Sequence, residues 1–60
     1  MTKEQWIKEA NEYLVNITGP WENGLSIDYC ESLYQDYVEE DDSGFWSPSD
    51  AVDEDMTYWD

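Results

Sequence analysis

Negative charge is the feature that most limits how this 60-residue chain can fold. Sixteen Asp and Glu residues stand against two Lys, Lys3 and Lys8, and the chain has no Arg and no His, so its formal net charge is -14. Such a surface repels itself and destabilises the compact state. Nucleic acids and anionic membranes carry charge of the same sign, which disfavours both as direct partners. We therefore expect a cationic partner, either a basic protein groove or a metal ion.

Aromatic content indicates that the chain folds despite this charge. Four Trp, five Tyr and one Phe are present, and each such residue can bury roughly 150 to 250 Å². Acidic disordered segments are typically poor in aromatics. A chain this short still buries only about 60% of the surface that its unfolded form exposes. We expect a single domain of marginal stability spanning residues 1–60.

The N-terminal segment carries both a start and a stop signal for a helix. Thr2 and Gln5 have the spacing of a capping box. Gly19 suits the position after a helix and Pro20 prevents its continuation. Apolar residues between these signals recur at helical spacing. The sequence predicts a first helix over residues 3–18.

Two further helices are predicted in the acidic part of the chain. Apolar residues recur at helical spacing over 27–39, with Ser26 available as a cap. Ser47 as a cap and Pro48 at the first helical position indicate a short third helix. We expect an all-α, three-helix domain, with an antiparallel first pair and the C-terminal third lying across it. Asn23-Gly24 is a hairpin signal and leaves α+β as the alternative fold.

Four acidic residues of the second predicted helix, Asp28, Glu31, Asp36 and Glu39, fall on one side of it. At 100° per residue they lie within about 140° of one another, opposite the apolar face. Their axial steps are roughly 4.5 to 7.5 Å, whereas phosphates along one DNA strand repeat about every 3.4 Å. The row approaches the charge density of DNA only if the later acids share its surface. The predicted partner-binding residues are the acids of this row, the later acids and two tryptophans that could anchor a partner. They are Asp28, Glu31, Asp36, Glu39, Glu40, Asp41, Asp42, Trp46, Asp53, Glu54, Asp55 and Trp59.

Charge-presenting helices of this kind resemble a known class of inhibitors. A very short, acidic, aromatic-rich helical chain with stacked carboxylates and an acidic-aromatic C-terminal segment is similar, in composition and layout, to the DNA mimics that phages and mobile elements encode. Those proteins act against restriction enzymes, CRISPR effectors and other proteins that handle nucleic acid. The resemblance implies that carboxylates replace phosphates in a basic groove of a host defence protein. It also implies, for a phage-encoded inhibitor, a location in the host cytoplasm.

A calcium loop is an alternative interpretation of the segment "EEDDSGFWSPSD". Its twelve residues resemble an EF-hand loop, with potential ligands or the turn glycine at Glu39, Asp41, Ser43, Gly44, Ser47 and Asp50. Glu39 is longer than the usual first Asp, and Asp50 is too short for the usual bidentate Glu. Ser47 and Asp50 are better explained as helix-capping residues. A third possibility is an acidic-aromatic interaction segment that stays partly disordered.

Catalytic chemistry is not expected from this composition. The chain has no His, no Arg and no nucleophile beside a base, and it is too small to enclose a pocket of about 300 Å³ or more. No cofactor or metal site is predicted. Cys30, the single cysteine, faces the apolar side of the second helix and is expected to be a buried structural thiol in a reducing, cytoplasmic setting. No apolar run approaches the roughly 20 residues of a membrane span.

Overall fold

The chain folds into three α-helices. A computed structural model of the protein describes residues 2–22, 24–40, 44 and 46–59. The helices are α1 (Lys3–Thr18), α2 (Leu25–Tyr34) with its π-helical continuation η1 (Gln35–Glu39), and α3 (Pro48–Met56). The described residues contain no strand, which confirms the all-α prediction over the α+β alternative. None of the helices in this part of the chain is long and apolar enough to cross a membrane.

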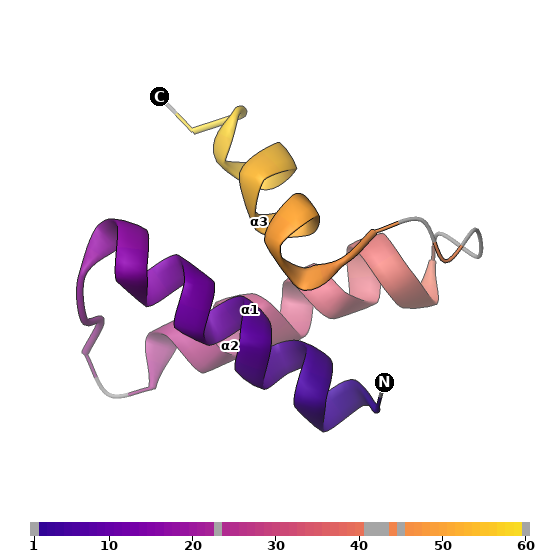
Figure 1. Cartoon of the computed structure of the whole chain (residues 1–60), viewed down its shortest axis with the longest axis horizontal. Coiled ribbons are helices and arrows are strands. Elements are labelled where there is room, and N and C mark those ends of the chain that lie inside the picture. The colour runs from indigo at the N-terminus through magenta and orange to yellow at the C-terminus, as the bar shows by residue number, and fades with distance from the viewer. Residues whose placement is uncertain (1, 23, 41–43, 45, 60) are drawn as a thin grey trace.

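The three helices differ in how closely they pack. Figure 1 shows α1 and α2 running in opposite directions, as expected, with α3 placed across them and its C-terminal end pointing away from the pair. α1 packs extensively against both other helices, whereas α2 and α3 contact each other over a smaller area. α1 is therefore the central element of the fold.

Side-chain caps fix the start of α1 and of α3, as the sequence predicts. The Thr2 hydroxyl accepts a hydrogen bond from the Gln5 N–H at 3.2 Å, and the Gln5 side chain accepts one from the Thr2 N–H at 3.4 Å. The Ser47 hydroxyl accepts from the Asp50 N–H at 3.3 Å in the same way. Each cap satisfies a backbone donor that has no partner within the helix. Gly19 ends α1 with a φ of 91°.

The start of α2 differs from the prediction. The helix begins at Leu25, and Ser26 is not its cap but lies inside the helix with only 6% of its surface exposed. Gly24 takes the capping position in the left-handed conformation, with a φ of 71°. Glycine adopts this conformation without the penalty that a Cβ imposes. The conformation that makes Asn-Gly a hairpin signal is used here to enter a helix; Asn23 itself lies outside the described residues.

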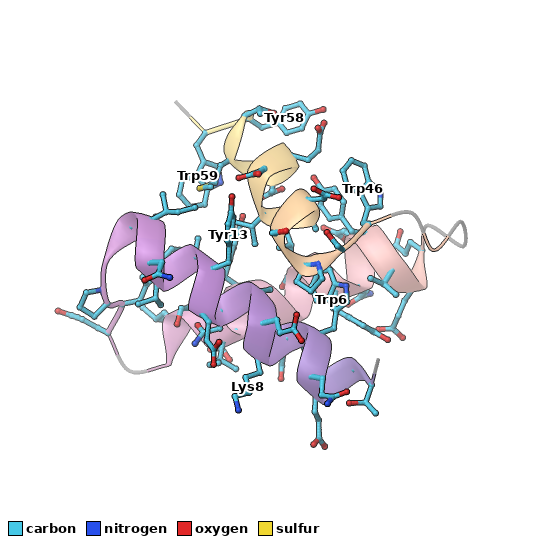
Figure 2. The ribbon with its side chains drawn as sticks, viewed as in Figure 1. Trp6, Lys8, Tyr13, Trp46, Tyr58 and Trp59 are labelled. Atoms are coloured by element: carbon cyan, nitrogen blue, oxygen red, sulfur yellow. The ribbon has the colours of Figure 1, made fainter. Side chains whose placement is uncertain are left out.

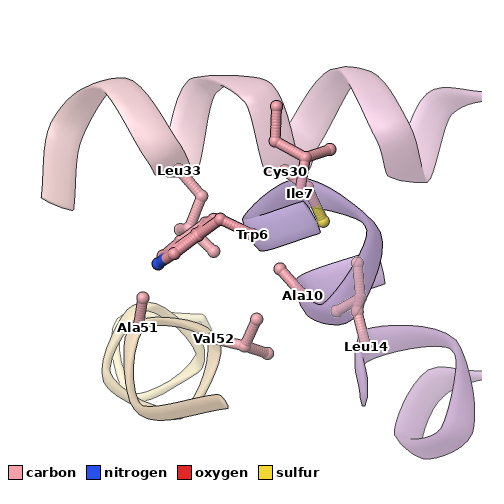
Figure 3. Close-up of a cluster of buried hydrophobic side chains, with 8 residues drawn as sticks. All are labelled: Trp6, Ile7, Ala10, Leu14, Cys30, Leu33, Ala51 and Val52. Atoms are coloured by element: carbon pink, nitrogen blue, oxygen red, sulfur yellow. The ribbon is translucent and has the colours of Figure 1, made fainter. Parts of the chain in front are cut away.

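The core is formed by eight side chains that converge from all three helices (Figure 3). Half of them come from α1, and the full set is Trp6, Ile7, Ala10, Leu14, Cys30, Leu33, Ala51 and Val52. Full burial of a large apolar side chain contributes about 1.5 to 3 kcal/mol. Cys30 is buried, as predicted from its position on the apolar side of the helix. Half-buried tyrosines and tryptophans pack against this small core.

Candidate acidic interaction surface

The acids of α3 point in two directions. Asp55 follows Ala51 by four residues and Val52 by three, so it lies on the side of the helix that faces the core. Asp53 and Glu54 lie on the outer side. The predicted cluster at residues 53–55 is therefore divided by the geometry of the helix.

Asp55 connects α3 to α2 through two tyrosine hydroxyls. Tyr29 donates a hydrogen bond to its Oδ2 atom, and Tyr37 donates a longer one, of 3.4 Å, to Oδ1. Burial, together with the bond to Asp55, raises the pKa of Tyr29 above its ordinary value. Burial and the charge of Asp55 raise the pKa of Tyr37 to about 12. Both tyrosines therefore remain protonated donors at neutral pH, and Asp55 is half-buried as a structural residue.

Tyrosines also orient the outer carboxylates of α3. Tyr13 of α1 donates a 2.7 Å hydrogen bond to Asp53 Oδ1, and this bond raises the pKa of Tyr13. Tyr58 donates a 3.3 Å bond to Glu54 Oε2. A phenol hydroxyl satisfies a carboxylate without carrying a positive charge. The carboxylates are thus held in place while their negative charge is left uncompensated.

Both lysines of the chain lie away from the outer side of α3. The Lys3 ammonium is 4.0 Å from Glu39 Oε1 and 5.6 Å from the centre of the Tyr34 ring. Lys8 points away from α3 in Figure 2. The Lys3–Glu39 pair is the only ion pair within the described part of the chain, and its side chains are 56% and 54% exposed. A pair this exposed contributes only about 0 to 1 kcal/mol.

Two shallow hollows are lined by carboxylates of α3 and of α1. The first has a volume of about 470 Å³ and is lined by Trp46, Asp50, Asp53, Glu54 and Thr57. The second has a volume of about 600 Å³ and is lined by residues of α1 and of the start of α3: Glu9, Glu12, Tyr13, Asn16, Ser47, Pro48 and Ser49. The Tyr13–Asp53 hydrogen bond links the two hollows. We call the five carboxylates that line them the acidic face: Glu9, Glu12, Asp50, Asp53 and Glu54.

The predicted row on the second helix is exposed. It lies on α2 and η1, whereas the acidic face lies on α1 and α3. We call it the α2 row: Asp28, Glu31, Asp36 and Glu39. Glu40, which follows the row directly, is exposed as well. The buried side of α2 is formed by Ser26, Cys30 and Leu33. At helical spacing the row lies mostly opposite these residues. Asp41 and Asp42, which were expected to extend it, lie outside the described residues.

The two predicted anchor tryptophans both take part in the fold. The Trp46 ring packs edge-on against Tyr37 at 5.1 Å, and its carbonyl accepts a 3.4 Å hydrogen bond from Trp6 Nε1. The Trp59 ring lies 5.7 Å from Tyr29 and remains 42% exposed. Trp46 is half-buried and lines the first hollow of the acidic face, so only this tryptophan adjoins those carboxylates.

The described part of the 39–50 segment is used for helix capping. Ser47 caps α3 through the Asp50 N–H, as the sequence indicates. Asp41 and Ser43, two potential ligands of the EF-hand interpretation, lie outside the described residues. Across the described ranges, no group of three or more His, Cys, Asp or Glu side chains is arranged to hold a metal ion. Burial raises the pKa of the Cys30 thiol to about 11, which keeps it protonated at neutral pH.

Sequence reasoning missed part of this surface. Glu9 and Glu12 were not among the predicted binding residues, because only the tertiary contact between α1 and α3 places them beside the start of α3. Asp50 was not among them either, although its spacing to Asp53 and Glu54 could have identified it. The inward position of Asp55 could have been found from its spacing to Ala51 and Val52.

Comparison with protein-family models, with curated protein sequences and with solved structures gives no match for this chain.

Proposed function

We propose that the protein binds the basic, nucleic-acid-binding groove of another protein and inhibits it by DNA mimicry. The target class is the one that the sequence suggests, a restriction enzyme or CRISPR effector of a host defence system. The observation that best supports this proposal is the acidic face: Tyr13 and Tyr58 orient two of its carboxylates, and neither lysine compensates them.

The spacing of the α3 carboxylates suits a groove that binds phosphates. Asp50, Asp53 and Glu54 lie within five residues of helix, and the four steps from the first to the last cover about 6 Å of axis at 1.5 Å per residue. Three charges over this length give a mean separation of about 3 Å, close to the 3.4 Å repeat of phosphates along one DNA strand. The α2 row is sparser, with steps of roughly 4.5 to 7.5 Å. We therefore assign the contact to the acidic face.

Net charge contributes to the rate of binding as well as to its strength. A protein with a formal charge of -14 attracts a cationic groove before contact, and such steering raises association rates and falls steeply with ionic strength. The Debye length shortens from about 30 Å at 0.01 M salt to about 10 Å at 0.1 M. We expect association with the target to slow strongly over this range.

The proposal can be tested with two charge-matched variants. The first, Asp50→Asn/Asp53→Asn/Glu54→Gln, removes three charges from the acidic face. The second, Asp28→Asn/Glu31→Gln/Asp36→Asn, removes three charges from the α2 row. Each triple variant also removes one acid from the first turn of a helix, Asp50 of α3 or Asp28 of α2, so their effects on helix stability are comparable.

Binding is measured by surface plasmon resonance against a panel of purified restriction enzymes and CRISPR effectors, with and without a competing DNA duplex. We expect the native chain to bind at least one member, the duplex to displace it, and the acidic-face variant to lose at least tenfold more affinity than the α2-row variant. Binding that the duplex does not affect, or equal losses in the two variants, would refute the proposal.

A further inference from the structure

We infer that the hollow beside Trp46 is an acceptor site for an arginine side chain of the partner. This inference rests on the proposed function and deepens it, because it assigns one side-chain type to one position of the interface. The hollow has a volume of about 470 Å³, and three of its five lining residues are carboxylates.

The carboxylates of this hollow complement a positively charged side chain. Asp50, Asp53 and Glu54 are three and four residues apart on α3, and all three line the same hollow. Asp53 accepts a 2.7 Å hydrogen bond from Tyr13, and Glu54 accepts a longer one from the exposed Tyr58, so both partners are neutral donors. A cationic side chain that enters the hollow meets carboxylates that are already oriented, which reduces the ordering cost of binding.

The aromatic wall is what selects arginine over lysine. Trp46 lines the hollow with the carboxylates, and it is positioned by its edge-on contact with Tyr37 at 5.1 Å. A guanidinium group stacks on an aromatic face and forms bidentate hydrogen bonds with carboxylates, whereas an ammonium group acts as a compact and strongly hydrated point charge. Trp is the most favourable aromatic partner for a cation. The combination of indole and carboxylates therefore matches guanidinium better than ammonium.

A third, less polar hollow adjoins the first at Trp46. Its volume is about 330 Å³ and it is lined by Trp6, Val38, Gly44, Trp46, Ser47 and Pro48. Figure 2 shows Trp46 beside α3. An arginine in the acidic hollow would place neighbouring apolar atoms of its own chain next to this surface. The paired hollows thus fit a protein segment better than a small polyamine or a metal ion.

The probes for this site are two capped hexapeptides of equal charge, hexa-arginine and hexa-lysine, titrated into the protein by isothermal calorimetry at 0.15 M salt. We expect hexa-arginine to bind about fivefold more tightly, as one cation–π contact at a partly exposed site would give. Trp46→Leu and Asp50→Asn/Glu54→Gln should each reduce this preference below about twofold. The control Asp28→Asn/Glu31→Gln removes the same charge from the α2 row and should retain the full preference.

Equal affinity of the native chain for the two peptides would overturn the inference. So would a preference that persists in Asp50→Asn/Glu54→Gln, the variant that decides the matter if Trp46→Leu does not fold. The proposed function is tested separately by the DNA competition. Displacement by duplex without a preference for arginine would refute only the arginine site, whereas a preference without displacement would refute only DNA mimicry.

Discussion

Replacement of Asp55 by alanine tests whether tyrosine hydroxyls, rather than cations, hold α3 on the rest of the fold. Asp55 accepts hydrogen bonds from Tyr29 and Tyr37, which lie on the neighbouring α2 and η1. The substitution leaves two partly buried hydroxyls without their acceptor. It also removes one negative charge from a chain that has a large excess of them.

The size of the effect follows from these contacts. A hydrogen bond to a charged acceptor contributes about 1.5 to 3 kcal/mol, and the 3.4 Å bond from Tyr37 adds little to the bond from Tyr29. Alanine regains about 0.5 kcal/mol through its higher helix propensity. We expect a net loss of about 1 to 2.5 kcal/mol, which lowers the Tm of a domain of this size by about 4 to 20 °C.

The assay is thermal and urea unfolding followed by circular dichroism, with Asp36→Ala as the matched control. Asp36 is an exposed acid of η1, so its replacement should change stability by less than about 0.5 kcal/mol. A double-mutant cycle of Asp55→Ala with Tyr29→Phe should show a coupling of at least about 1 kcal/mol. If Asp55→Ala is as harmless as Asp36→Ala, or if the cycle shows no coupling, the hydrogen bonds from Tyr29 and Tyr37 to Asp55 do not stabilise the fold.

Three further predictions concern charge, pH and the thiol. Raising salt from 0.01 to 1 M shortens the Debye length from about 30 to about 3 Å, which weakens the repulsion between the carboxylates of the folded chain. We expect the Tm to rise by about 4 to 8 °C. A Tm that does not change would contradict this prediction. The fold raises the pKa of Tyr37 to about 12, so the stability that it contributes is present below about pH 10 and is lost as the pH rises towards 12. Alkaline unfolding monitored by circular dichroism should therefore be shallower in Tyr37→Phe, and identical curves would argue against the Asp55 contact. Cys30 is fully buried with a raised pKa, so a thiol reagent should label it slowly in the native chain and rapidly in guanidinium; fast labelling in both would show that the core opens readily.

Local signals in the sequence were sufficient for most of the fold. The capping box at Thr2 and Gln5 and the cap at Ser47 each require only neighbouring residues, and both are present in the structure. The start of α2 was misplaced because two signals competed there. Ser26 is a good capping residue by type, yet Gly24 adopts the left-handed conformation first and places Ser26 within the helix.

The candidate site was harder to predict, because it depends on which helices are neighbours. Helical spacing identified the exposed α2 row but could not show that α1 contributes Glu9 and Glu12 to the same hollow as the start of α3. Tyrosines posed a similar difficulty. Helical spacing predicts that their rings lie on the side facing the core. It does not predict the acceptors of their hydroxyls, such as Asp53 for Tyr13, which lie up to 40 residues away in the chain.

The central claim, that the acidic face is the surface presented to a basic groove, is tested most directly by a nuclear magnetic resonance map of the interface. The chain labelled with ¹⁵N is titrated with a panel member that DNA displaces, and changes in amide signals are recorded. We expect the largest changes at Glu9, at Glu12 and over residues 46–57. Changes confined to the amides of residues 28–40 would contradict the claim, because they would place the contact on the α2 row.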